Sequence, residues 1–309
     1  MSETIKDNVT RIHPSNTSSS FPSQFTKNSD IENILINNMS LVANHWFRFQ
    51  SEWTYNAYKT LKDLDKYLIL IYLIQKTFKH YSDMFLIISE ETIYNHEKFE
   101  IEKINLIEIS EELNIAKETV RRKINELNNS GVIERSGKKI ILHTEAFKKQ
   151  RPLKTVTLLA NFLSIISRIL SEENRNIINS PVESKELEHF IRSNFTLIWK
   201  FYFRTQIPNL VDWRNFYGDL ETWAVAGTVL INQMHKIRDK YKGKGVIFDS
   251  DKLSNDEKFK KVYETAFSKG NEITGINASS ISEISGIPRA TVIRKLKQGM
   301  KMGVLEKDK

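Results

Sequence analysis

The chain has 309 residues, a net charge of +8 and a pI near 9.3. A chain of this length can form two domains with separate cores, and its positive charge suits a polyanionic partner such as nucleic acid. The absence of cysteine excludes disulfides, cysteine nucleophiles and thiolate metal sites, and it agrees with a reducing, cytoplasmic location.

The N-terminal region changes character near residue 30. Fourteen of the first thirty residues are Ser, Thr or Asn, so 1–30 buries too little apolar surface to fold and is expected to be a disordered tail. From 31 to 85, apolar residues recur at helical spacing. The run from Tyr67 to Ile74 predicts a buried helix, because no turn residues flank it. It is far shorter than the roughly 20 residues of a membrane helix, so no membrane partner is expected.

A second block of helices is expected after residue 148. Residues 154–172 place large apolar side chains on one broad face, which suits either core packing or a homodimer interface. A linker containing Pro181 is expected next, at 174–184. The aromatic segment 190–217 either lines an effector pocket, for an effector of unknown identity, or packs in the core. A loop at 242–245 and a charged helix at 256–268 follow.

Two segments of the chain repeat. Residues 109–135, ISEELNIAKETVRRKINELNNSGVIER, and residues 281–307, ISEISGIPRATVIRKLKQGMKMGVLEK, align without a gap at an offset of 172 residues. They share eleven identities in twenty-seven positions, which indicates an internal duplication. Looser counterparts outside these motifs are Asp63-Leu-Asp65 with Asp219-Leu-Glu221, and Trp46 with Trp199.

The spacing within each motif is that of a helix-turn-helix. In the first motif a short helix buries Ile109 and Leu113, and a tight turn follows at Asn114. Gly286 occupies the turn position of the second motif. The second helix of the first motif buries three residues at helical spacing, namely Val120, Ile124 and Leu127.

The side chains opposite this buried stripe form an outward face that could enter the major groove of DNA. Arginine matches the major-groove edge of guanine, and a carboxylate can accept a hydrogen bond from cytosine. Lysines on the flanks are expected to contact phosphates. In the second motif we expect Ile293 to pack against protein, so that motif is the weaker DNA-binding element. The candidate DNA-contacting set, with the wing residues discussed next, is Lys117, Glu118, Thr119, Arg121, Arg122, Lys123, Asn125, Arg135, Lys138, Lys139, Arg289, Thr291, Arg294, Lys295 and Lys297.

The residues after the first motif predict a β-hairpin. Segments 132–135 and 139–142 are rich in strand-forming residues and flank a Gly-containing turn at 136–138. This hairpin would form a wing whose basic residues Arg135, Lys138 and Lys139 contact phosphates. The second motif is followed by too few residues for a hairpin, so its wing is expected to be truncated or absent.

The first motif resembles the winged helix-turn-helix regulators of bacteria, and within them the DNA-binding domain of the cyclic-AMP receptor protein family. The resemblance rests on Ile109-Ser110, Asn114-Ile115, Lys117-Glu-Thr-Val120 with Arg122, Gly131-Val-Ile133 and Gly137-Lys138. It implies base contacts by Lys117, Glu118 and Arg122. In the second motif only Arg289 and Arg294 carry over, because Ala290 replaces the glutamate. Ala116 and Pro288 stand where that family has a capping serine, and no cyclic-nucleotide cassette precedes the motif.

The sequence therefore predicts a mainly α protein made of two halves, each a helical bundle followed by a helix-turn-helix, with a small β-hairpin wing after the first. The expected domains are 31–148 and 149–309. The predicted function is a cytoplasmic, nucleoid-associated transcription regulator that binds double-stranded DNA. The alternatives are a plasmid-type replication initiator and a chromosome-organisation protein that uses winged helices for protein contacts. No catalytic motif, metal site or cofactor site is expected, so the protein is not predicted to be an enzyme.

Overall fold

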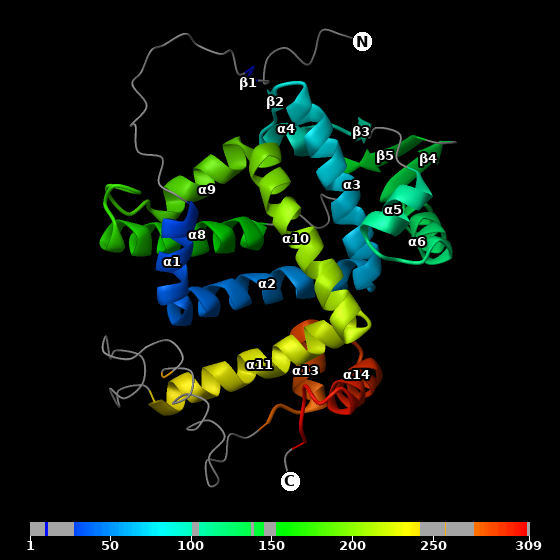
Figure 1. The fold of residues 1–309 in the computed structure, drawn as a ribbon. Coiled ribbons are helices and arrows are strands. Elements are labelled where there is room, and N and C mark those ends of the chain that lie inside the picture. The colour runs from blue at the N-terminus through cyan, green and yellow to red at the C-terminus, as the bar shows by residue number, and fades with distance from the viewer. Residues whose placement is uncertain are drawn as a thin grey trace.

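A computed structural model describes residues 10–11, 28–100, 105–136, 139–144, 153–241, 257 and 275–307. The fold is mainly α-helical with a small antiparallel sheet, which confirms the predicted fold class (Figure 1). The predicted loop at 242–245 and nearly all of the predicted helix at 256–268 lie outside the described residues. So does most of the predicted tail. Within 1–30, the strand β1 (Thr10–Arg11) pairs with β2 (Leu86–Ile87), and a helix already begins at Asn28.

Three helices open the first half of the chain: α1 (Asn28–Asn37), α2 (Met39–Leu61) and α3 (Leu64–Asp83). The predicted buried helix is α3, in which every residue from Tyr67 to Leu73 is buried. Asp63 caps its N-terminus by accepting a hydrogen bond from the amide of Lys66 at 2.8 Å. The short helix α4 (Glu90–Asn95) follows and is capped by Ser89.

Four helices open the second half: α8 (Leu153–Glu173), α9 (Ser184–Ser193), α10 (Phe195–Tyr217) and α11 (Leu220–Tyr241). The bounds of α9 and α10 are those of α1 and α2 displaced by 156 residues at both ends. The same offset relates Asp63 to Asp219, as the sequence indicated. It does not relate Trp46 to Trp199, because Trp46 corresponds to Tyr202, so that pairing was wrong.

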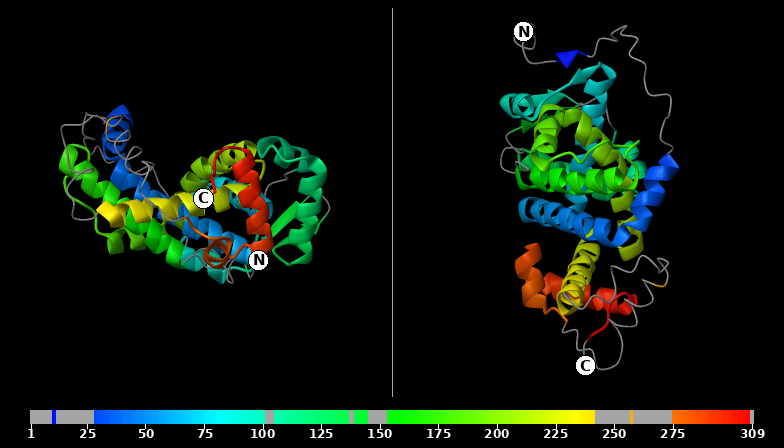
Figure 2. Two further views of the ribbon diagram at one scale, coloured as in Figure 1. Left: turned by 90° about the horizontal axis from the view of Figure 1, so that it is seen from below. Right: turned by 90° about the vertical axis from the view of Figure 1, so that its left-hand side faces the viewer.

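The two halves share one continuous hydrophobic core, in which α10 packs across α3. Helix α2 lies between α8 on one side and a layer of three helices on the other (Figure 2). That layer consists of α11, α13 (Ala278–Ser285) and α14 (Arg289–Lys301). Aromatic residues Trp199 and Phe203 of α10 are buried at the centre, whereas Phe201 and Phe216 are exposed. The expected boundary near residue 148 therefore does not separate two cores.

Helix α8 buries part of its apolar face within the chain. Val156, Leu159 and Ile169 are buried, and the helix packs against α1, α2 and α9, as the core interpretation predicted. The homodimer interpretation stays a prediction. The segment Thr155–Glu173 is long and apolar enough to cross a membrane, with a mean hydropathy of 1.2, but half of that window is buried in the protein. Partial burial of this kind is also found in core helices of soluble proteins, so the segment is weak evidence for a membrane span.

The first helix-turn-helix consists of α5 (Leu106–Glu112) and α6 (Lys117–Asn129), and the second of α13 and α14 (Figure 1). The predicted hairpin is present as β4 (Ile133–Ser136) and β5 (Lys139–His143). A third strand, β3 (Lys98–Glu100), pairs with the other edge of β5 and was not predicted. The resulting sheet, in the order β3-β5-β4, is compatible with a winged helix-turn-helix.

Candidate nucleic-acid interface

The first helix-turn-helix is held by local hydrogen bonds and a small apolar core. Asn105 caps α5 by accepting a hydrogen bond from the amide of Glu108 at 2.8 Å. Ser110 Oγ donates to the carbonyl oxygen of Ile115 at 2.7 Å and so ties the turn to α5. Asn114 takes the left-handed conformation that the tight turn requires, with φ of 49°. The predicted core residues of both helices are buried, which confirms the motif.

The second helix-turn-helix repeats these contacts at an offset of 172 residues. Asn277 accepts a hydrogen bond from the amide of Ser280 at 2.9 Å, and Ser282 Oγ donates to the carbonyl oxygen of Ile287 at 2.7 Å. Gly286 provides the left-handed turn residue, with φ of 74°. The predicted lack of a side-chain cap on the recognition helices is also observed, since neither Ala116 nor Pro288 forms one.

The charged side chains on the outward face of α6 pair with one another along the helix, and Glu126 also pairs with Lys66 of α3 at 3.2 Å. Arg121 pairs with Glu118 at 2.5 Å, and Arg122 pairs with Glu126 at 2.8 Å. Both arginines are about three-fifths exposed, and solvent-exposed pairs within one helix each contribute only about 0.3–0.5 kcal/mol. DNA can therefore displace the glutamates at small cost. Asn125 is exposed on the same face.

The outward face of α14 is more basic than that of α6. Helix α14 contains five basic residues and no acidic residue, a net charge of +5, whereas α6 has four basic and two acidic residues, a net charge of +2. Arg289, Arg294 and Lys297 are exposed, and Arg289 Nε donates to Ser279 Oγ at 3.1 Å. Ile293 is half-buried, in keeping with the expected packing.

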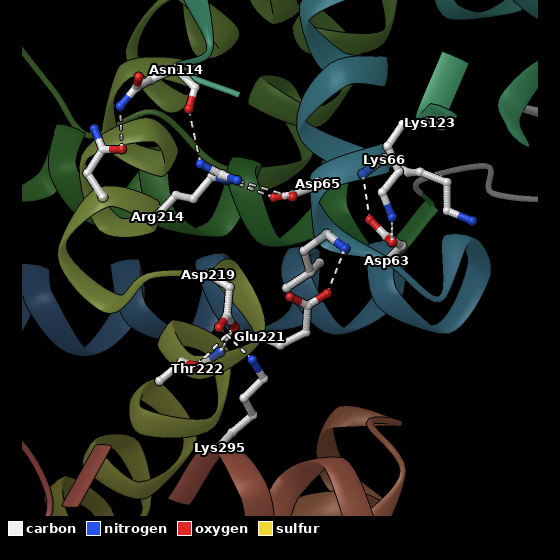
Figure 3. A network of polar contacts seen from close by, with 12 residues as sticks. Asp63, Asp65, Lys66, Asn114, Lys123, Arg214, Asp219, Glu221, Thr222 and Lys295 are labelled. Carbon is white, nitrogen blue, oxygen red and sulfur yellow. Dashed lines mark hydrogen bonds and ion pairs between the residues drawn. The ribbon is translucent and has the colours of Figure 1, made fainter. Parts of the chain in front are cut away.

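Two of the lysines predicted to contact DNA are buried and do not lie on the outward faces. Lys123 and Lys295 are 6% and 8% exposed, and each forms an ion pair with an aspartate, Asp63 for Lys123 and Asp219 for Lys295 (Figure 3). Their ammonium groups face the helical bundle, because each aspartate sits at the start of the helix against which the recognition helix packs. These lysines position α6 and α14 and are not free to contact DNA.

The sequence carried a signal for these anchors that was not recognised. Asp63 and Asp219 were identified as counterparts, and Lys123 and Lys295 were identified as identical positions of the two motifs. The sequence alone did not show that each aspartate pairs with the lysine of the same half. Burial raises the pKa of Asp219, but hydrogen bonds from Lys295 Nζ and the Thr222 amide outweigh it and hold that pKa below its usual range.

Each helix-turn-helix also contacts the long helix of the opposite half. Arg214 of α10 donates from Nη1 to the carbonyl oxygen of Asn114 at 3.1 Å and from Nε to Asp65 at 2.9 Å (Figure 3). Asn114 Nδ2 donates to Asn215 Oδ1 at 2.9 Å. In the second motif, a Cβ placed on Gly286 would lie 2.7 Å from the side chain of Lys59 in α2. These contacts fix both motifs on one scaffold.

The remaining predicted contacts have varied surroundings. Lys117 and Arg135 are exposed, and Thr119 and Thr291 are half-buried. Lys138 and the side chain of Lys139 lie outside the described part of the chain. Within the described ranges, no three His, Asp or Glu side chains gather in a way that could hold a metal ion.

The comparison with protein families matches residues 100–137 to the DeoR-like helix-turn-helix domain. The match covers both helices of the first motif, β4 and only the last residue of β3. It supports a DNA-binding, helix-turn-helix transcription regulator, and it does not single out the cyclic-AMP receptor family. No curated protein and no solved structure is significantly similar to the chain. Residues 100–137 are therefore similar to a DeoR-like helix-turn-helix domain.

Proposed function

We propose that this protein is a sequence-specific transcription regulator that contacts double-stranded DNA through two helix-turn-helix motifs on one chain. The observation that carries the proposal is the repeated geometry of the two motifs, from the asparagine cap to the serine–carbonyl bond, the left-handed turn and the Asp–Lys anchor. The protein acts in the cytoplasm, associated with the nucleoid, and has no catalytic role.

An internal duplication accounts for this geometry. Gln50 and Gln206 are counterparts at the 156-residue offset, and they donate hydrogen bonds to each other at 2.9 and 2.7 Å within the core. A residue meets its own equivalent on the twofold axis of a symmetric dimer. The pair therefore supports a chain that imitates such a dimer, with one helix-turn-helix contributed by each half.

The two motifs have different roles in DNA binding: the first contacts bases and the second contacts phosphates. The exposed Arg122 and Glu118 of α6 suit base contacts in the major groove, because guanine and cytosine present complementary donors and acceptors there. Lys295 is paired with Asp219, but the other four basic residues of α14 have no acidic residue in the same helix, and their charge suits phosphate contacts, which set affinity and register more than sequence preference. The hairpin β4–β5, carrying Arg135, adds a phosphate contact beside α6 as a wing.

Because the two motifs differ, the target site should be asymmetric. Symmetric dimers bind palindromes whose half-sites lie about one helical turn apart. A single chain with two unlike recognition helices would instead favour two different half-sites at a fixed spacing.

Genome-wide DNA occupancy of the wild type and of the Arg122→Ala variant tests the proposal. We expect discrete promoter peaks in the wild type that are lost in the variant. A matched control is Lys79→Ala, because Lys79 forms the same type of exposed pair four residues along a helix, with Asp83 of α3, away from both motifs. Peaks confined to a replication origin would favour the initiator alternative. No peaks above background would overturn sequence-specific binding and favour a protein partner.

A further inference from the structure

A cavity of about 100 Å³ lies where α3 crosses α10. Its walls are aromatic and aliphatic side chains from several elements, including Trp53 of α2, Ile71 of α3, Phe195 of α10 and Leu142 of β5. No charged side chain lines it among the described residues. An apolar wall of this kind disfavours a charged occupant, since an unpaired charge in such a site carries a large desolvation cost.

Two side chains that line the cavity each carry a polar atom with no hydrogen-bond partner among the described residues. These atoms are Tyr67 Oη and Trp199 Nε1, and both are fully buried. The two residues as a whole are 5% and 1% exposed. The hydroxyl of Thr77, which also lines the cavity, is satisfied by the carbonyl oxygen of Leu73 at 2.9 Å. A buried polar group without a partner is unfavourable, and native proteins keep few of them.

The chemistry of these two atoms defines what would satisfy them. The indole N–H can only donate, and the phenol can donate or accept. Burial raises the pKa of Tyr67 well above its ordinary value, so the phenol keeps its proton at neutral pH. Water would satisfy the donors but would meet apolar walls on its other sides, whereas a buried water normally makes about three hydrogen bonds.

We propose that this cavity binds a small, uncharged ring compound that carries a hydrogen-bond acceptor, with Trp199 Nε1 and Tyr67 Oη as its polar contacts. An apolar cavity of about 150 Å³ holds one benzene ring, so a cavity of about 100 Å³ admits at most one ring, and its walls must move outward slightly to accept it. The cavity is a binding site separate from the candidate DNA interface.

The position of the cavity connects it to the first helix-turn-helix. Phe99 of β3 and Leu142 of β5 form part of its wall and belong to the sheet beside α6. Helix α3 forms another wall, and the aspartate that caps it anchors Lys123 of α6. No residue of α13 or α14 lines the cavity. A ligand there would therefore change DNA binding by the first motif and leave DNA binding by the second motif unchanged. This effect on DNA binding rests on the proposed function, whereas binding of the ligand to the cavity does not.

Pyridine and benzene are suitable probes, because they have nearly the same shape and differ in one hydrogen-bond acceptor. With ¹⁵N-labelled tryptophan in the full chain, we expect pyridine to shift the indole N–H resonance of Trp199 and benzene to bind about fivefold more weakly. The variant Tyr67→Phe keeps the ring and removes only the hydroxyl, so it should weaken pyridine about fivefold while leaving benzene unchanged and should not destabilise the fold. Trp199→Phe replaces a fully buried indole with a smaller ring, so it removes the N–H but also enlarges the cavity and lowers stability, and it is the less specific test.

Equal binding of the two probes, or no response of the Trp199 resonance to either at saturating concentration, would overturn the proposal. Retention of full pyridine affinity in Tyr67→Phe would do the same. Failure of the probe to change DNA affinity, with the resonance shift intact, would contradict only the link to the first motif. These readouts need no DNA target, so they remain informative even if the proposed regulatory function is wrong.

Discussion

The two helix-turn-helix motifs share a scaffold and differ in the surface that they present. Both are capped by asparagine, held by a serine–carbonyl bond and anchored by a buried lysine. The first has ion-paired arginines on its outward face and a hairpin beside it, whereas the second has a recognition helix without acidic residues. The contacts that hold each motif on the bundle are therefore alike in the two motifs, whereas the charges on their outward faces differ.

The largest expected effect tests the shared part of this comparison. Replacing Lys123 or Lys295 with methionine leaves a partly buried aspartate without its partner, and each change should lower the free energy of unfolding by about 2 kcal/mol. Urea denaturation measures both. The control Lys79→Met, at an exposed pair, should change stability by less than about 0.5 kcal/mol. A large cost for one lysine only would mean that the anchors are not equivalent.

The outward faces should give unlike effects on DNA binding. Arg122→Ala should weaken binding to the target by about 1–3 kcal/mol and relax the preference at one base pair. Arg294→Ala should weaken target and random DNA alike and reduce the slope of log affinity against log salt by about one. Fluorescence anisotropy titrations at several salt concentrations measure both quantities. If Arg294→Ala relaxed the sequence preference as strongly as Arg122→Ala, the proposed division of work would be wrong.

Two glycines test whether the recognition helices end in the same way. Gly131 and Gly303 are counterparts at the 172-residue offset and have φ of 71° and 74°. A Cβ at either would meet no atom within 4 Å, so alanine should cost only the backbone strain of about 1 kcal/mol at both sites. In contrast, Gly227→Ala inside α11, which also has free space, should stabilise by about 0.5–1 kcal/mol. Thermal unfolding of the three variants checks the signs.

The smallest effect concerns pH and the acidic pair of the second half. Burial raises the pKa of Glu221, and the hydrogen bond from the Leu64 amide offsets only part of this rise. Burial also acts to raise the pKa of Asp219, but the hydrogen bonds from Lys295 and Thr222 outweigh it and lower that pKa. When the pKa of a carboxyl is higher in the folded than in the unfolded state, the protein loses stability as pH rises through the folded-state pKa. When it is lower in the folded state, the protein loses stability as pH falls through that pKa. Relative to the wild type, Glu221→Gln should therefore gain stability between pH 4 and neutrality, by less than about 1 kcal/mol.

Asp219→Asn should have the opposite pH dependence. Its deficit relative to the wild type should be largest at neutral pH and shrink as pH falls through the range in which aspartate titrates. Urea unfolding at a series of pH values follows both variants. Parallel pH profiles for the two would contradict the opposite shifts.

Apolar periodicity was enough to predict the local elements. The stripes of Val120, Ile124 and Leu127 and the run of α3 specify helices by themselves, and the hairpin follows from its turn. Strand β3 was missed because it has three residues and its partner β5 lies some forty residues downstream. The buried lysines were missed because a lysine on the flank of a helix is usually solvated, and because their aspartate partners lie 60 and 76 residues away in sequence.

The position of the two motifs relative to each other depended on long-range contacts that no local pattern encodes. Arg214 joins Asp65 to the turn of the opposite motif across about 100 to 150 residues of chain. The Gln50–Gln206 pair spans 156 residues. Both are short polar contacts between helices whose sequences are not adjacent, and their geometry follows from the assembled core.

A hydroxyl-radical footprint of the full chain on its target DNA tests the central claim most directly. Two protected patches are predicted, one lost in Arg122→Ala and the other lost in a variant carrying both Arg294→Ala and Lys297→Ala. One patch only, lost in Arg122→Ala and unaffected by the changes in α14, would contradict DNA contact by two motifs on one chain.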